Sequence, residues 1–196
     1  MADNWQTTGR QFFLGILFSI MIMKTISEEY LYLQKELHLN PNYGVASLQM
    51  APAVKKIFED SNFISISDYG AGKKNLEKGL LELGLKNFEY YPYDPVFPEY
   101  GSPKEADIVC CIDVLEHIEE VYLSNVLDEL KKITINLGFF TVATKPAGKF
   151  LRDGRNAHLI QKPASWWLPM MCSRFEIEFL QNIPLGFLLI VKAKNI

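Results

Sequence analysis

Hydrophobic and polar positions follow two different periods along this chain, and the changes of period predict its elements. The clearest change lies at 63–72, where a β-branched apolar run ends in Asp68 and two glycines follow, Gly70 and Gly72. Leucines at helical spacing come next, over 73–83. The pattern predicts a buried strand, a tight turn and a helix. Such a turn requires glycine for its dihedrals even without a ligand, yet it also lets a ligand approach the backbone beside a helix N-terminus.

Runs of the same kinds predict the rest of the chain. Strands are expected at 88–94, 107–112, 137–144, 175–180 and 186–193, and helices at 27–39, 51–59, 121–133 and 163–169. Pro52 is expected near the first turn of its helix. Only the loop 95–105 separates the second and third strands, where most doubly wound domains have another helix and strand. The order predicts a three-layer α/β fold with a mostly parallel sheet, an antiparallel last strand and an N-terminal helical extension.

The beginning of the chain reads as a separate unit, an apolar extension over 1–24 in front of a domain at 25–196. Residues 12–23 are continuously apolar, but they fall short of the roughly twenty residues that span a bilayer as a helix. A signal-peptide core, a membrane-surface anchor and a segment packed on the fold or on a second copy remain open. Asp3 and the missing A-x-A pattern argue against a cleaved signal. If Met23 is the natural start, the run has no evolved role. Membrane association is not favoured.

Composition narrows the class of protein. The chain has 196 residues, 48% of them hydrophobic, which suffices for one sizeable core. The net charge of −3 gives no basic field for a phosphate backbone, so nucleic acid is not a favoured partner. Cys110, Cys111 and Cys172 lack metal-ligand spacing and are interpreted as reduced core residues of a cytoplasmic protein. The oligomeric state stays open.

Polar residues that could bind a ligand or take part in catalysis follow the strands. Asp94 ends the second strand, where doubly wound folds place the acid that binds ribose hydroxyls, although a turn aspartate before Pro95 would look the same. The loop 145–159 follows a later strand and gathers charged and polar side chains: Arg152, Asp153, Arg155, Asn156 and His158. Because loops at the carboxyl ends of strands border the ligand crevice, these side chains are candidates for binding an acceptor.

Three motifs in chain order resemble the class I S-adenosylmethionine-dependent methyltransferases. They are Asp68-Tyr-Gly-Ala-Gly72, Asp94, and Ala106-Asp-Ile-Val followed by Asp113-Val-Leu-Glu-His117, and the resemblance covers about 63–145. It implies a Rossmann-like fold with strand order 2-1-4-5-7-6 and the usual third strand absent. It also implies S-adenosyl-L-methionine as the donor, bound by Asp68, Gly70, Gly72, Asp94 and Asp113. The chain departs from the family at Lys73 and Lys74, which replace a third glycine, and in the short loop where an adenine-binding acid is usual.

Methyl transfer is an in-line displacement, and a hydroxyl or ammonium acceptor must also lose a proton. His158 is the first candidate base and His117 the second. Substrate-binding candidates are Arg152, Arg155, Asn156 and Trp166, although the loop residues would equally serve to brace the loop and the tryptophan to pack in the core. No metal is expected, because a solvated helix start explains Glu116, Glu119 and Glu120 as well as a partial metal constellation does.

The predicted function is methyl transfer to a small-molecule or carbohydrate-like acceptor, at oxygen or nitrogen. The N/D-P-P-Y/F sequence of nucleobase amino-methylation is missing after the 107–112 strand. Two alternatives stay open. One is a donor-binding module or partner subunit without activity, and the other is an NAD-dependent oxidoreductase, for which the glycine spacing is poor.

Overall fold

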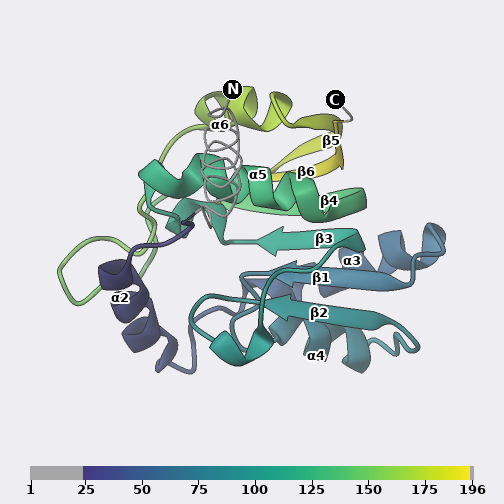
Figure 1. The fold of residues 1–196 in the computed structure, drawn as a ribbon, viewed down its shortest axis with the longest axis horizontal. Helices are drawn as coiled ribbons and strands as arrows, with labels where there is room; N and C mark the ends of the chain where they lie inside the picture. Colours follow the sequence, from purple (N-terminus) through teal and green to yellow (C-terminus); the bar gives the residue numbers. More distant parts are fainter. Residues whose placement is uncertain (1–23, 195–196) are drawn as a thin grey trace, which may run out of the picture.

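A computed structural model describes residues 24–194 of the chain as a six-stranded sheet between two layers of helices (Figure 1). The strands are β1 (Ser65–Tyr69), β2 (Glu89–Tyr93), β3 (Ala106–Ile112), β4 (Thr134–Ala143), β5 (Phe175–Ile183) and β6 (Gly186–Ala193). Their order in the sheet is β2-β1-β3-β4-β6-β5. The first four run parallel, and β6 is antiparallel to both β4 and β5. With the third strand of the full fold absent, this is the predicted order.

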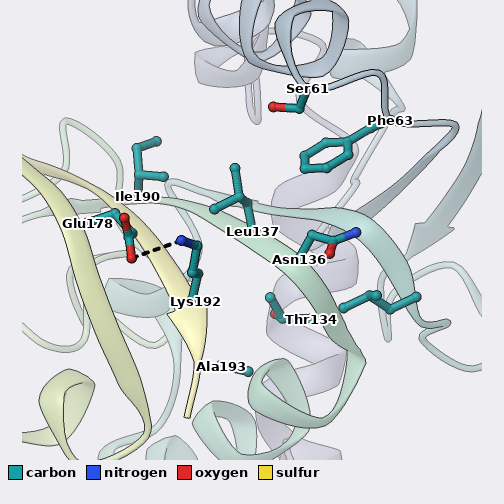
Figure 2. Close-up of a pocket in the computed structure, with 10 residues that line it drawn as sticks. Ser61, Phe63, Thr134, Asn136, Leu137, Glu178, Ile190, Lys192 and Ala193 are labelled. Atoms are coloured by element: carbon teal, nitrogen blue, oxygen red, sulfur yellow. Dashed lines mark ion pairs between the residues drawn. The ribbon is translucent and has the colours of Figure 1, made fainter. Parts of the chain in front are cut away.

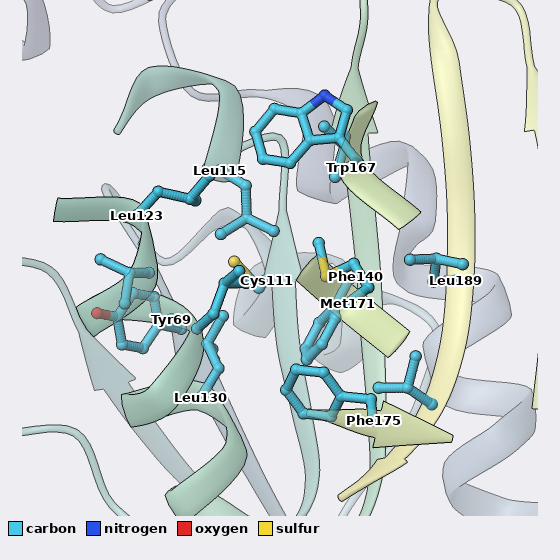
Figure 3. Packing of buried hydrophobic residues seen from close by; sticks show 14 of the residues in the cluster. Tyr69, Cys111, Leu115, Leu123, Leu130, Phe140, Trp167, Met171, Phe175 and Leu189 are labelled. Atoms are coloured by element: carbon cyan, nitrogen blue, oxygen red, sulfur yellow. The ribbon is translucent and has the colours of Figure 1, made fainter. Parts of the chain in front are cut away.

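Helices cover both faces of the sheet because each presents one apolar stripe to it. On one face lie α3 (Ala46–Asp60) and α4 (Asn75–Glu82), which enclose a core with β1, β3 and β4. On the other lie α5 (Leu123–Ile133) and α6 (Ala164–Cys172). Figure 3 shows this second core, where Trp167 and Met171 of α6 pack beside Cys111 and Phe140 of the sheet. Trp167, one of the two tryptophans in the helix expected at 163–169, is therefore a core residue.

The remaining helix, α2 (Glu28–His38), lies beyond the carboxyl ends of β1, β2 and β3, and the three arrows point toward it in Figure 1. It begins at Ser27, whose side chain accepts a hydrogen bond from the backbone N–H of Tyr30, and Glu28 and Glu29 occupy its first turn. The helical extension thus places side chains over the edge of the sheet where ligands bind in such folds.

Several predicted details were wrong. Helix α3 begins at Ala46, so Pro52 lies inside it, because Ala51, Val54 and Phe58 are buried and tertiary packing outweighs the missing proline N–H. The helix expected over 121–133 begins only at Leu123, because Val121 belongs to the 3₁₀ turn Glu120–Tyr122 before α5. Val121 is 76% exposed.

One cysteine was also misplaced. Cys110 and Cys111 are buried in β3 as predicted, but Cys172, the last residue of α6, is exposed and is no core residue. The apolar run 12–23, and with it almost all of the predicted extension, lies outside the described residues. Among residues 24–194, no helix combines the length and the apolar character needed to cross a bilayer.

Candidate functional site

A cavity of about 640 Å³ opens at the carboxyl ends of the parallel strands, under α2. Seven of the eleven site residues predicted from the sequence line it: Asp68, Gly70, Gly72, Asp94, Asp113, His117 and His158. The other four do not border it, namely Arg152, Arg155, Asn156 and Trp166. The cavity therefore joins both predicted histidines to the glycine turn in one space.

The glycine turn forms the floor of one end. Gly70 has φ +78°, and a Cβ built there would lie 2.4 Å from Cγ2 of Val114. Both the backbone conformation and the close approach therefore require glycine. Asp94 fixes the turn to β2, since its Oδ2 accepts from the N–H of Gly72 at 3.0 Å and its Oδ1 from the N–H of Val96 at 2.8 Å. These bonds hold a buried carboxylate beside the cavity, although burial raises its pKa.

The short loop after β2 borders the cavity through Pro95 and Val96, and its two aromatic rings do not line it. Phe97 and Tyr100 are stacked, with ring centroids 5.3 Å apart and planes 12° apart. The hydroxyl of Tyr100 donates to the carbonyl of Gly72 at 3.0 Å. The loop that replaces a helix and strand is thus tied to the glycine turn. Coverage of a bound base by these rings stays a prediction.

Asp68, at the end of β1, is buried and accepts a hydrogen bond from the hydroxyl of Tyr90. Burial raises the pKa of its carboxyl to about 7, and the negative charge of Asp94 acts in the same direction. Since the unfolded pKa is near 4, the folded protein holds a proton between about pH 4 and 7 that the unfolded chain has lost. Ionised Asp68 therefore destabilises the fold.

We expect this carboxyl to make the free energy of unfolding fall as the pH rises from about 5 to 7, by up to about 1.4 kcal/mol per pH unit. Asp68→Asn should show a shallower fall, because the amide can still accept from Tyr90 and does not ionise. Urea denaturation of both proteins at pH 5, 6, 7 and 8 measures this. Parallel curves for the two proteins would show that Asp68 does not titrate in this window.

The same cavity is lined by Asp113, His117 and His158, which together with the buried Glu116 form a group of four possible metal ligands. One ligand atom from each lies within 4.8 Å of all the others. Asp113 follows β3 with φ +58°, and its N–H bonds to Thr141 of β4. A 3₁₀ turn, Leu115–His117, then folds the next two ligands inward. His158 belongs to the loop after β4, so it meets the other three residues although it is more than forty positions away from them in the sequence.

Both imidazoles are held by backbone carbonyls. Nδ1 of His117 lies 2.8 Å from the carbonyl oxygen of Ala157, and Nδ1 of His158 lies 2.6 Å from that of Lys145. Because a carbonyl only accepts, each Nδ1 carries a proton, and in a neutral ring the Nε2 then has the lone pair. Metal-bound histidines are oriented in this way. Burial lowers the pKa of His117 to about 4, which keeps it neutral.

Glu116 is fully buried and only half satisfied. Its Oε1 accepts from the N–H of Ala143 at 2.7 Å, while its buried Oε2 has no hydrogen-bond partner among the described residues. Burial, and then the charge of Asp113, raises the pKa of this carboxyl well above its usual range. Two carboxyls and two imidazoles with ligand atoms this close together suit a cation. A bound cation would offset the burial of the Glu116 carboxyl and give its Oε2 a partner. A solvated helix start no longer explains Glu116, whereas Glu119 accepts from the N–H of Ser27 and Glu120 is exposed.

A row of five rings connects the loop after β2 to the possible metal ligands, and all of them except Phe97 line the cavity. Successive centroids lie 5.3, 4.9, 5.9 and 4.7 Å apart along Phe97, His38, Tyr43, His117 and His158. His38 and Tyr43 come from α2 and the segment after it, and sequence reasoning named neither of them as a site residue. Helix α2 does border the cavity, through Tyr30, Gln34 and His38.

The polar loop braces itself. Arg155 pairs with Asp153 at 2.6 Å, and Arg152 pairs with Glu36 of α2 at 2.8 Å. The side-chain oxygen of Asn156 accepts from the N–H groups of Ala147 and His158. These contacts match the bracing alternative and position His158, and the substrate-binding roles of Arg152, Arg155 and Asn156 stay predictions. Trp166 packs edge-on against Trp167, with centroids 5.1 Å apart, and its substrate-binding role also stays a prediction.

A second hollow of about 620 Å³ lies at the other end of the sheet, where β4 starts and β6 finishes (Figure 2). Phe63, Leu137 and Ile190 line it, and its charged side chains, Glu178 and Lys192, pair at 3.1 Å. The buried unpartnered polar atoms among residues 24–194 belong to Glu36, His38, Ser67 and Glu116, none of which lines this hollow. Of these four residues, His38 borders the first cavity, which is also lined by His117 and His158, so we place the candidate site there.

No family model matches the chain, and no curated protein matches it. Solved structures do. The 1,6-didemethyltoxoflavin-N1-methyltransferase of Burkholderia thailandensis, crystallised with 1,6-didemethyltoxoflavin and S-adenosylhomocysteine, is similar with a TM-score of 0.60 at 12% identity, over 88% of this chain and 92% of that one.

Two further structures agree. DhpI in its SAH complex has a TM-score of 0.55 at 13% identity, over 85% of this chain and 97% of that one. The methyltransferase domain of bacterial CtHen1-CN has a TM-score of 0.53 at 17% identity, over 75% and 99%. At these identities the likeness shows the fold, and the chain has the Rossmann-like fold of the class I methyltransferases, as predicted.

Proposed function

We propose that this protein transfers a methyl group from S-adenosyl-L-methionine to a hydroxyl of a small or carbohydrate-like acceptor, with a divalent cation held by Asp113, Glu116, His117 and His158. One observation carries the proposal. The glycine turn and its buried acid line the same cavity as Asp113, His117 and His158, which cluster with the buried Glu116. Transfer between two molecules requires such an arrangement, because donor and acceptor must meet in line.

The donor end supports the first half. Gly70 and Gly72 leave the backbone bare, and Asp94 presents a buried carboxylate that would accept from ribose hydroxyls. Two similar structures were crystallised with S-adenosylhomocysteine (SAH). The dinucleotide alternative is less well supported, since Lys73 and Lys74 stand where a third glycine would be needed.

The acceptor end supports the second half and leads us away from the metal-free expectation. Imidazole nitrogen and carboxylate oxygen suit Mn²⁺, Co²⁺, Zn²⁺ or, with more water, Mg²⁺. A bound cation would supply Lewis acidity that lowers the pKa of an acceptor hydroxyl, so that the hydroxyl proton could pass to solvent water and the oxygen could accept the methyl group. The backbone carbonyls of Lys145 and Ala157 engage Nδ1 of each ring, which leaves each Nε2 available as a ligand. In this arrangement His158 and His117 are ligands rather than bases.

The test has two stages. First, S-adenosylhomocysteine and NAD are titrated into the pure protein by calorimetry, and we expect binding of the former alone. Second, transfer from labelled donor is assayed on sugars, polyols and catechols after chelator treatment, with and without added Mg²⁺ or Mn²⁺. Selective NAD binding would overturn the donor assignment. Donor binding without transfer to any acceptor favours the inactive module, and transfer that resists chelation returns His158 to the role of general base.

A further inference from the structure

We propose that His38 is a donor-contact residue, and that its buried Nδ1 shares a hydrogen bond with a ribose hydroxyl of the bound donor. The inference rests on the proposed function and adds a residue to its donor site. His38 is the last residue of α2 and borders the cavity together with Gly72 and Asp94. It lies more than thirty residues before the glycine turn and belongs to none of the motifs.

The position of the ring points to the ribose. A Cβ built on Gly72 would lie 3.3 Å from Cε1 of His38 and 3.8 Å from its Nδ1, so the imidazole faces the turn directly. The N–H of Gly72 is itself bonded to Asp94, the acid at the ribose-binding position. A ligand hydroxyl that reaches Asp94 therefore comes close to this imidazole.

The ring is held in place but its nitrogen is not satisfied. Edge-to-face contacts with Tyr43 and Phe97, at 4.9 and 5.3 Å, fix the imidazole plane. Nδ1 is buried and has no hydrogen-bond partner among residues 24–194. A buried polar atom without a partner costs free energy, and an oriented one beside a cavity is accounted for by a ligand that pairs with it.

The charge state favours a hydroxyl over the carboxylate of the donor's methionine part. Burial, followed by the positive charge of Lys73, lowers the pKa of His38 to about 4, so the ring is neutral at neutral pH. Lys73 directs its own ammonium to the carbonyl of Asn40 at 2.5 Å. A neutral imidazole pairs with a hydroxyl as donor or acceptor without a charge change.

The experiment compares three variants by calorimetry with S-adenosylhomocysteine, adenosine and 2′- and 3′-deoxyadenosine. His38→Phe keeps the ring packing and removes both nitrogens, and His38→Gln restores a polar group. Leu39→Ala is the control, because the neighbouring Leu39 is 83% exposed. Melting temperatures of all variants verify folding.

We expect His38→Phe to weaken S-adenosylhomocysteine and adenosine about ten-fold, His38→Gln to recover part of the loss, and Leu39→Ala to match the parent. The deoxyadenosine that lacks the hydroxyl paired with His38 should bind the parent more weakly than adenosine does. His38→Phe should bind adenosine and that deoxyadenosine equally well. Unchanged adenosine affinity in His38→Phe overturns the inference, even if S-adenosylhomocysteine binds less well. A parent protein that binds neither ligand overturns the proposed function instead.

Discussion

Replacing His158 by alanine should lower the affinity for Mn²⁺ at least about 100-fold, since even outer-shell changes at metal sites cost 10- to 100-fold. Methyl transfer should fall at least as far. The substitution removes one of two imidazole ligands and leaves the buried Glu116 carboxyl with less compensation. S-adenosylhomocysteine affinity should stay within about two-fold, because the predicted donor contacts come from the glycine turn, Asp68 and Asp94 and not from His158. Calorimetry with Mn²⁺ and with S-adenosylhomocysteine measures both.

The chain provides its own matched control. It has three histidines, and the third, His38, is part of the same row of rings without belonging to the four possible ligands. His38→Phe should therefore leave Mn²⁺ affinity unchanged, whereas His117→Ala should behave like His158→Ala. If His158→Ala loses transfer but binds Mn²⁺ as tightly as the parent, the histidine is a base and the cation is held elsewhere. Undiminished binding in both alanine variants would remove the cation site.

The sequence predicted most of this fold because its signals are local. The strand that ends in Asp68 and the glycines after it specify a turn by dihedral requirements alone, and Asp94 follows a strand that pairs with it in parallel. Elements with strong periodicity were recovered, including the antiparallel pair β5 and β6. The boundaries failed where packing outweighs propensity, as at Pro52.

The site was harder to predict because its geometry is tertiary. Glu116 follows β3 like any residue at the start of a helix, and only the inward 3₁₀ turn buries it against Ala143. Arg155 and Asp153 look the same in sequence whether they bind a ligand or each other. His38 and Tyr43 entered the site because α2 lies over the strand ends, which no periodicity specifies. The sequence did offer one signal for His38: Gln34 lies four residues before it on α2, and that spacing puts both polar side chains on one helix face.

Replacing Asp94 by alanine should weaken S-adenosylhomocysteine about 100-fold, because two effects add. The carboxylate that would accept from the ribose hydroxyls is lost, and hydrogen bonds to charged groups contribute about 1.5–3 kcal/mol. The N–H groups of Gly72 and Val96 also lose their acceptor, which loosens the turn that the donor must contact. The affinity of Asp94→Asn should lie between those of the parent and Asp94→Ala, since its single amide oxygen can replace only one acceptor.

The exposed Asp60, paired with Lys56 on α3, supplies the control Asp60→Ala. Because Asp94 is not one of the four possible ligands, its variants should keep Mn²⁺ affinity, so the two substitutions separate donor binding from cation binding. Equal S-adenosylhomocysteine affinity in Asp94→Ala and the parent would mean that the donor does not occupy the crevice beside β2, and with it the in-line arrangement of donor and cation would fail.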